Sequence, residues 1–250
     1  MKQDGSAAGG RGFKIIHVAI ALAFGLTSGV LFTQYSAKAN LHPQQVVDSF
    51  HNLFYDASSI WAEHTDWLGV NVEKAPMDLW SYQQLLWNQK PDVLLEMGTY
   101  HGGSAYYFAT LFDLMHHGRV ITVDIKKWGS PPVHPRITYL LGSSVSPEIV
   151  AQIRNLVKPG EKVMVVLDSD HHRDHVLKEL QTYAGFVTPG CYLVVEDTNV
   201  NGHPVNRAFG PGPGEATADF LKTTDAFQPD PDYERFLVSF NPGGWLKRIR

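Results

Sequence analysis

Short apolar runs recur along the chain after residue 90, and helical patterns separate most of them. The runs are rich in Val, Leu and Ile, which is typical of strands buried on both faces of a parallel sheet. They are Val93–Glu96, Val120–Asp124, Ile137–Leu141, Val163–Asp168 and Tyr192–Glu196. This alternation predicts an α/β fold, a doubly wound sheet whose ligand site lies at the carboxyl ends of the strands.

The beginning of the chain has a different character. A polar tail, residues 1–12, precedes residues 13–33, in which the run Ile15–Phe32 is apolar. At about 18 residues this run is long enough to span a membrane, which predicts a single-pass anchor. Ala37-Lys38-Ala39 resembles a signal-peptidase site, so a secreted protein cleaved near Ala39 is the alternative.

Two helical patterns lead from this segment into the predicted sheet. Leu41–Asp56 carries apolar residues at roughly helical spacing, which indicates an amphipathic helix. Met77–Asn88 follows the same period, and Asp78 in its first turn favours the helix dipole. We therefore expect a linker and amphipathic helical region over residues 34–75 and a catalytic domain over residues 76–250.

Composition narrows the class of partner. The chain has 250 residues and a net charge of −4, without a basic patch interleaved with aromatic residues. This argues against nucleic acid as a partner. Cys191 is the sole cysteine, so no intrachain disulfide can form, and its place in an apolar strand favours a core residue over a nucleophile.

A glycine-rich turn joins the first predicted strand to a helix. Gly98 and Gly102 allow sharp turns and a close approach of the backbone to a ligand, although glycines here are also ordinary turn chemistry. The spacing G-x-x-x-G-G departs from the dinucleotide fingerprint, and the strand ends on Glu96, which points away from NAD and toward S-adenosylmethionine. Asp124 ends the next strand, where a carboxylate can accept hydrogen bonds from ribose hydroxyls.

The last apolar segments break the alternation of strands and helices. Phe236–Phe240 and Trp245–Ile249 flank Asn241-Pro-Gly-Gly244, a pattern that predicts a β-hairpin. A Rossmann-like parallel sheet that ends in an antiparallel hairpin is typical of class I methyltransferases and not of NAD dehydrogenases.

Four carboxylates follow two neighbouring strands of the predicted sheet. They are Asp168, Asp170, Glu196 and Asp197. Adjacent parallel strands lie about 4.8 Å apart, so these acids can converge on one cation. Carboxylate oxygens suit Mg²⁺ better than Zn²⁺, and like charges this close need a cation or protonation to relieve them.

Histidines lie beside these acids. His172-Arg-Asp174 matches the H-x-D metal-binding motif of Fe(II) oxygenases. Those enzymes are usually all-β, however, whereas this chain alternates strands with helices. His171 lies nearest the strand end and is the best candidate for a general base near neutral pH.

Several motifs together resemble the cephalosporin hydroxylase/rhamnosyl O-methyltransferase family over about residues 60–250. They are Trp67-Leu-Gly69, the stretch from Lys74-Ala-Pro76 to Gln83, Glu96 to Ser104, Leu167 to His171, Val195-Glu196-Asp197-Thr198 and Phe240 to Gly244. The resemblance implies a class I S-adenosylmethionine fold with a Mg²⁺ site similar to that of catechol O-methyltransferase.

The resemblance also implies a role for each matching residue. Glu96, Gly98 and Gly102 would form the cofactor loop, Ser104 would contact the methionine carboxylate, Asp124 would hold the ribose and Ser143 would contact adenine. Asp168, Glu196 and Asp197 would bind the metal, with Asp170 as an alternative to Asp168. Catechol enzymes carry a lysine base three residues after the first metal acid; His171 stands there, which leaves the identity of the base open.

The expected function is therefore Mg²⁺-dependent methyl transfer from S-adenosylmethionine to a hydroxyl of a sugar, glycolipid or related small molecule. A metal-dependent oxygenase and a non-catalytic protein with this fold are the alternatives. Lys2, Arg11 and Lys14 precede the apolar run, which favours a catalytic domain across the membrane from the cytosol, where the cofactor is made. The sequence leaves open the side of the membrane, the acceptor and whether the chain forms a homo-oligomer.

Overall fold

The computed structural model describes residues 42–250. Of the two units into which the chain divides, the larger, Val47–Arg250, contains the sheet and the candidate site. The predicted polar tail, the apolar segment 13–33 and the cleavage site near Ala39 lie outside the described residues. Among the helices of residues 42–250, none combines the length and the apolar character needed to cross a membrane.

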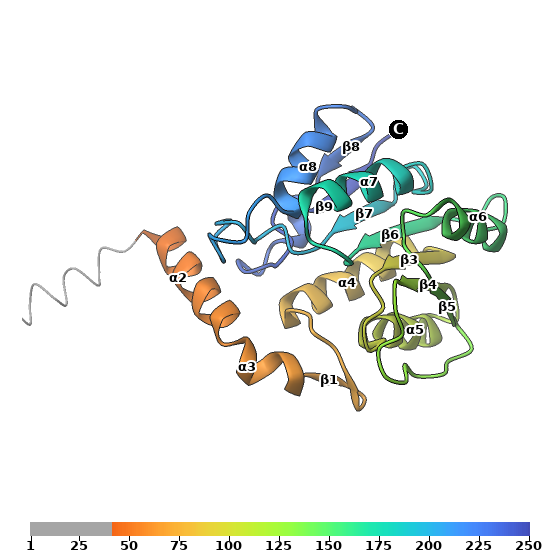
Figure 1. Ribbon diagram of the computed structural model, residues 1–250, viewed down its shortest axis with the longest axis horizontal. Coiled ribbons are helices and arrows are strands. Elements are labelled where there is room, and N and C mark those ends of the chain that lie inside the picture. Colours follow the sequence, from red (N-terminus) through yellow and green to blue (C-terminus); the bar gives the residue numbers. More distant parts are fainter. Residues whose placement is uncertain (1–41) are drawn as a thin grey trace, which may run out of the picture. The chain divides into compact units, whose positions relative to one another are not determined.

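Within the described residues, seven strands form one sheet in the order β5-β4-β3-β6-β7-β9-β8 (Figure 1). The strands are β3 Val93–Met97, β4 Arg119–Asp124, β5 Ile137–Leu141, β6 Val163–Leu167, β7 Tyr192–Val195, β8 Phe227–Pro229 and β9 Trp245–Arg248. The first five run parallel and coincide with the predicted strands to within a residue or two. The prediction of a doubly wound α/β sheet is confirmed.

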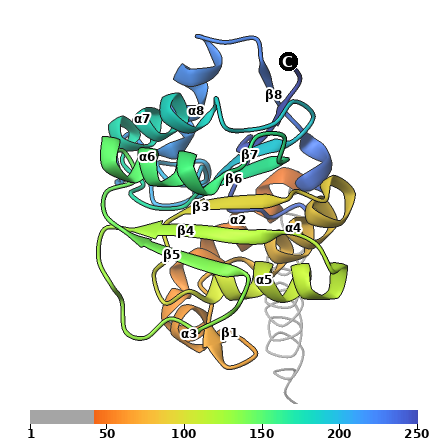
Figure 2. The same ribbon diagram turned by 90° about the vertical axis from the view of Figure 1, so that its right-hand side faces the viewer.

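Helices cover both faces of the sheet, because the chain moves from β3 to β5 in one direction and from β5 to β7 in the other, and right-handed crossovers in opposite directions place their helices on opposite faces. α4 and α5 lie on one face, and α6, α7 and α8 on the other (Figure 2). The helices are α2 Pro43–Asp56, α3 Ser58–Trp61, α4 Pro76–Gln89, α5 Gly103–Met115, α6 Pro147–Leu156, α7 Arg173–Tyr183 and α8 Pro213–Leu221. Smaller elements are the 3₁₀ turns Ala62–His64 and Pro231–Tyr233 and the strand pair β1 Asp66–Trp67 and β2 Val70–Asn71.

The core lies on either side of the central strands. β3 and β6 are buried along their whole length, as continuous apolar strands of a parallel sheet should be. Trp245 and Cys191 are fully buried, so the expectation that Cys191 is a core residue is confirmed. Burial raises the pKa of the Cys191 thiol to about 11, which keeps it protonated.

The antiparallel end of the sheet differs in detail from the predicted hairpin. β9 pairs antiparallel with β7 and with β8, so the partner of the last strand is Phe227–Pro229 and the prediction of a strand at Phe236–Phe240 is wrong. Leu237 has a left-handed φ of +70°, which a strand cannot accommodate. The Phe240 amide donates to Asp78 Oδ2 at 2.8 Å instead of to a neighbouring strand. The apolar alternation of this segment therefore reflects packing of a loop.

Candidate functional site

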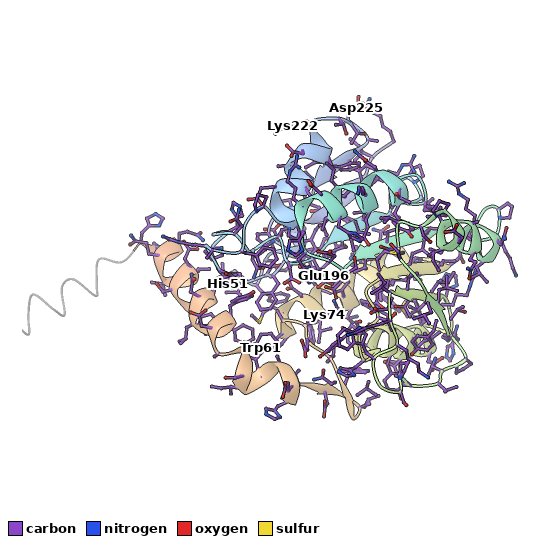
Figure 3. All side chains as sticks on the ribbon, in the orientation of Figure 1. His51, Trp61, Lys74, Glu196, Lys222 and Asp225 are labelled. Atoms are coloured by element: carbon purple, nitrogen blue, oxygen red, sulfur yellow. The ribbon has the colours of Figure 1, made fainter. Side chains whose placement is uncertain are left out.

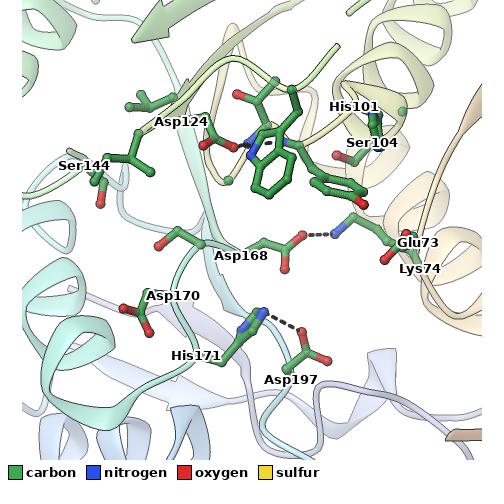
Figure 4. A pocket seen from close by; sticks show the side chains of 18 of the residues that line it. Glu73, Lys74, His101, Ser104, Asp124, Ser144, Asp168, Asp170, His171 and Asp197 are labelled. Carbon is green, nitrogen blue, oxygen red and sulfur yellow. Dashed lines mark hydrogen bonds and ion pairs between the residues drawn. The ribbon is translucent and has the colours of Figure 1, made fainter. Parts of the chain in front are cut away.

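A cavity of about 540 Å³ opens at the carboxyl ends of the parallel strands (Figure 4). The loops after β3, β4, β5, β6 and β7 all contribute to its lining, together with residues 71–74 before α4. Seven predicted site residues and the alternative Asp170 line it. The seven are Gly98, Ser104, Asp124, Ser143, Asp168, His171 and, from the β7 loop, Asp197. Glu96, Gly102 and Glu196 do not form part of this lining.

Gly98 brings the first of these loops against the end of β6. Its φ is +106°, and a Cβ at this position would lie 1.7 Å from the carbonyl oxygen of Asp168, so a side chain cannot be accommodated. The Asp168 amide in turn donates to the Met97 carbonyl at 2.7 Å. The glycine therefore sets the distance between the loop after β3 and the acidic loop after β6.

Glycine is needed at position 102 for a different structural reason than at position 98. Its φ is +82°, and a Cβ there would lie 3.0 Å from Pro131 and 3.1 Å from Pro132, outside the cavity. The next residue, Gly103, is the first of α5, and a Cβ on it would lie 1.8 Å from the Asn71 carbonyl. These two glycines pack the loop against its neighbours.

Asp124 organises the same loop from the end of β4. Its Oδ2 accepts the Thr99 amide at 3.0 Å and the Tyr100 amide at 2.9 Å, and its Oδ1 accepts the Lys126 amide at 3.1 Å. The carboxylate thereby supports Tyr100, whose φ of +47° is unusual for a bulky residue. Its side chain also faces the cavity (Figure 4), so the same acid supports the loop and lines the cavity.

Glu96 lies beneath the loop, fully buried on β3. Thr122 Oγ1 donates to its Oε2 at 2.7 Å, and burial raises the pKa of Glu96 to about 7, with Lys74 opposing the shift. Ser104 and Ser143 line the cavity from α5 and from the loop after β5.

Asp168, His171 and Asp197 form a compact cluster on the cavity wall. One ligand atom from each lies within 4.8 Å of the others, and His171 Nε2 is 3.3 Å from Asp197 Oδ2. Asp170 is outside this cluster: its Oδ1 accepts the His172 amide at 2.9 Å and pairs with the His172 ring at 2.5 Å. The geometry thus favours Asp168 over Asp170 as a metal ligand.

Glu196 turns away from the cluster toward a residue that sequence reasoning did not single out. Its Oε1 accepts hydrogen bonds from Lys74 Nζ at 2.6 Å and from the Tyr82 hydroxyl at 2.5 Å. Lys74 Nζ also lies 2.7 Å from Asp168 Oδ2. The available signal for Lys74 was its place in the Lys74-Ala-Pro76 motif, directly before α4.

The electrostatics of the cluster follow from burial and mutual proximity. Burial raises the pKa of Asp168, Glu196 and Asp197. The positive charge of Lys74 opposes this rise at all three carboxylates, and His171 also opposes it at Asp168 and Asp197. Burial alone would lower the pKa of Lys74, but Asp168 and Glu196 raise it, so its ammonium stays charged. For His171, burial lowers the pKa, and the negative charges of Asp197, Asp168 and Glu196 together raise it by more.

A second polar network joins cavity-lining side chains next to Ser143 to a buried acid on α7. Glu179, fully buried on α7, accepts hydrogen bonds from Ser144 Oγ and, at 2.7 Å, from Ser169 Oγ. His175 Nε2 lies 3.2 Å from the same Glu179 oxygen and lines the cavity. Glu179 also escaped sequence analysis, because a single acid in a helical pattern carries no signal of burial.

Known proteins match this chain over most of its length. A family model described as Rhamnosyl O-methyltransferase/CmcI matches residues 59–249. A rhamnosyl O-methyltransferase of Mycobacterium tuberculosis (strain H37Rv) is 35% identical over 221 residues, which cover 86% of this chain and 87% of the relative. The corresponding protein of Mycobacterium leprae (strain TN) is 39% identical over 215 residues, which cover 81% and 90%.

Solved structures match the fold. The CmcI-N160 apo-structure superposes with a TM-score of 0.61 at 20% identity over 75% of this chain and 77% of that chain. A second structure, titled cmcI-D160 Mg-SAM, gives 0.59 at 20% identity over 75% and 78%. At this identity the match establishes a shared class I methyltransferase-like fold.

Proposed function

This chain belongs to the Rhamnosyl O-methyltransferase/CmcI family, and from that premise we propose that it transfers a methyl group from S-adenosylmethionine to a sugar hydroxyl with Mg²⁺. The acceptor class is supported by the names of the curated relatives, which are rhamnosyl O-methyltransferases. The cofactor and metal are supported by the solved relative whose title names Mg and SAM.

One observation carries the proposal. The cavity has a glycine-rich loop with Asp124 along one side and the cluster of Asp168, His171 and Asp197 along another. Its volume of about 540 Å³ lies within the usual range for small-molecule sites. A cofactor in the first part would therefore present its methyl group to an acceptor held at the second part.

The donor set fits a divalent cation. Asp168 and Asp197 would hold Mg²⁺, since carboxylate oxygens are its preferred protein ligands. Glu196, the third predicted ligand, lies next to them. Its Oε1 accepts hydrogen bonds from Lys74 and Tyr82, so after a side-chain shift it would join through its other oxygen, Oε2. When bound, Mg²⁺ supplies Lewis acidity that eases deprotonation of an acceptor hydroxyl.

His171 is the proposed general base. Its Nε2 contacts Asp197 Oδ2, so we assign the proton-accepting role to the other ring nitrogen, Nδ1. Asp197 would then hold the ring in place and stabilise the imidazolium that forms. His171 lines the cavity, which places the base on the acceptor side of the site.

The proposed cofactor contacts are those of the cavity lining. Gly98 and Ser104 would lie along the methionine part, Asp124 would accept from the ribose hydroxyls and Ser143 would lie near adenine. Glu96 and Gly102 would act indirectly, by supporting the loop.

Tyr100 and Trp128 add an aromatic wall to the cavity, with ring centroids 5.0 Å apart. This wall is a better platform for a ligand ring than the buried Trp245.

We also propose that residues 13–33 anchor the protein in a membrane as a single-pass segment. The support is the apolar run Ile15–Phe32 and the basic residues before it. Protease protection of the tagged full-length chain in sealed vesicles identifies the side of the catalytic domain. A mature N-terminus at Asn40 would replace the anchor with a cleaved signal.

An acceptor panel tests the function. The purified protein, S-adenosylmethionine and Mg²⁺ are incubated with a rhamnosyl glycoside, a glucosyl glycoside and a catechol, and the products are identified by mass spectrometry. We expect a methylated glycoside and an equal amount of S-adenosylhomocysteine. Consumption of dioxygen with formation of a hydroxylated product would instead support the oxygenase alternative.

A further inference from the structure

Lys74 brings a buried positive charge into the carboxylate cluster. Its Nζ lies 2.7 Å from Asp168 Oδ2 and 2.6 Å from Glu196 Oε1, and its side chain is only 3% exposed. Figure 3 shows Lys74 and Glu196 close together in the interior, and Figure 4 shows the Lys74 ammonium directed at Asp168 across the cavity. This lysine therefore occupies the space between two acids of the proposed metal site.

The backbone around Lys74 holds the ammonium in this position. Val72 and Ala75 on either side are buried, and Pro76 begins α4 directly after them. Gly103 of α5 packs so closely on the Asn71 carbonyl that a Cβ would come within 1.8 Å of it. The ammonium is therefore presented by a packed segment, unlike that of an ordinary surface lysine.

The charges of the cluster require a cation. Asp168, Glu196 and Asp197 are three carboxylates at two adjacent strand ends, and such like charges destabilise one another unless an opposite charge lies near. In the structure Lys74 supplies that charge to Asp168 and Glu196. A divalent cation bound to Asp168 and Asp197 would supply it as well, and the two positive charges would repel each other at close range.

We propose that Lys74 is a built-in counter-cation that competes with the divalent metal for Asp168. The metal binds when the Lys74 ammonium leaves Asp168 and remains on Glu196 and near the Tyr82 hydroxyl. This inference rests on the metal site of the proposed function and adds a role for a residue outside that site's ligand set. Lys74 stabilises the metal-free site and lowers its affinity for metal.

Calorimetric titration of metal-free protein with Mg²⁺ alone tests the competition. Lys74→Met removes the charge and retains an apolar chain of similar length, so we expect Mg²⁺ to bind about tenfold more tightly than in the wild type. Lys222→Met is the matched control, because Lys222, directly after α8, forms an exposed ion pair with Asp219 at 2.8 Å. Its affinity should equal that of the wild type. Equal or weaker binding by Lys74→Met would overturn the proposal.

Thermal unfolding gives a second, independent readout. Metal-free Lys74→Met should melt below the wild type, and saturating Mg²⁺ should raise its melting temperature by more than it raises that of the wild type. A melting temperature equal to that of the metal-free wild type would contradict the stabilising role. If Lys74→Met does not fold, Lys74→Gln carries the same two tests, since its amide can still donate to Glu196 without a charge.

The proposed metal site and the proposed role of Lys74 can be disproved separately. A wild-type protein that binds no Mg²⁺ would overturn the proposed metal site and the role of Lys74 with it. Wild-type binding of Mg²⁺ together with unchanged affinity in both Lys74 variants would overturn the role of Lys74 and leave the metal site standing.

Discussion

Gly98 lies against the backbone of Asp168, so that a Cβ on the glycine would come within 1.7 Å of the Asp168 carbonyl oxygen. Gly98→Ala should therefore lower the free energy of unfolding by more than about 3 kcal/mol, because the backbone must move to relieve the clash. Urea denaturation measures the change. Gly160→Ala is the control. Gly160 has a φ of +87°, but a Cβ there would have no other atom within 4 Å, so this substitution should lower the free energy of unfolding by only about 1–2 kcal/mol. Equal costs would contradict the close contact.

Substitutions of Asp168 and Asp170 form a matched pair that tests which of the two acids binds the metal. Asp168→Asn should reduce turnover roughly 10²-fold or more while leaving S-adenosylmethionine affinity within a few-fold, because the residue acts at the metal end of the cavity. Asp170→Asn should retain most activity, since Asp170 pairs with His172. Initial rates and calorimetric cofactor titrations measure both effects. The reverse ranking would make Asp170 the ligand.

The strands and the place of the site were predictable because their signals are local. Apolar runs of β-forming residues determine β3 to β7, and a glycine turn between a strand and a helix indicates a loop at the edge of the cavity without any information from distant residues. Lys74 and Glu179 were missed because their roles depend on distant partners: Lys74 meets Glu196, a residue 122 positions away. Phe236–Phe240 was misread for the same reason, because its contact with Asp78 comes from 162 positions earlier.

His171 should be needed for the chemical step. His171→Ala should lower the rate roughly 10²-fold and remove the acid limb of the pH–rate profile, because the imidazole must be neutral to accept a proton. Single-turnover rates across pH measure this. His172→Ala is the control, since that ring is exposed and pairs with Asp170 outside the cluster. An unchanged profile in His171→Ala would transfer the role to another group.

Arg119 and Glu161 provide a pH-dependent contribution to stability away from the site. The Arg119 hydrogen bond lowers the pKa of Glu161 from 4.5 to about 2, although partial burial opposes the shift. Because the folded-state pKa is lowered, the contribution is complete above pH 4.5 and is lost as the pH falls toward 2. Glu161→Gln should therefore be destabilised by about 1 kcal/mol or less at pH 7. Denaturation at several pH values should show this difference shrinking in acid; a constant difference would contradict the ion pair.

Removal and restoration of Mg²⁺ test whether the protein transfers a methyl group to a sugar hydroxyl. Purified protein is freed of metal with chelator, mixed with methyl-labelled S-adenosylmethionine and a rhamnosyl glycoside, and assayed before and after addition of Mg²⁺. We expect label to enter the glycoside only after Mg²⁺ is restored, and we expect Asp168→Asn to abolish this restoration. Undiminished transfer in excess chelator would contradict the metal site, and label that never reaches a sugar hydroxyl would contradict the proposed function.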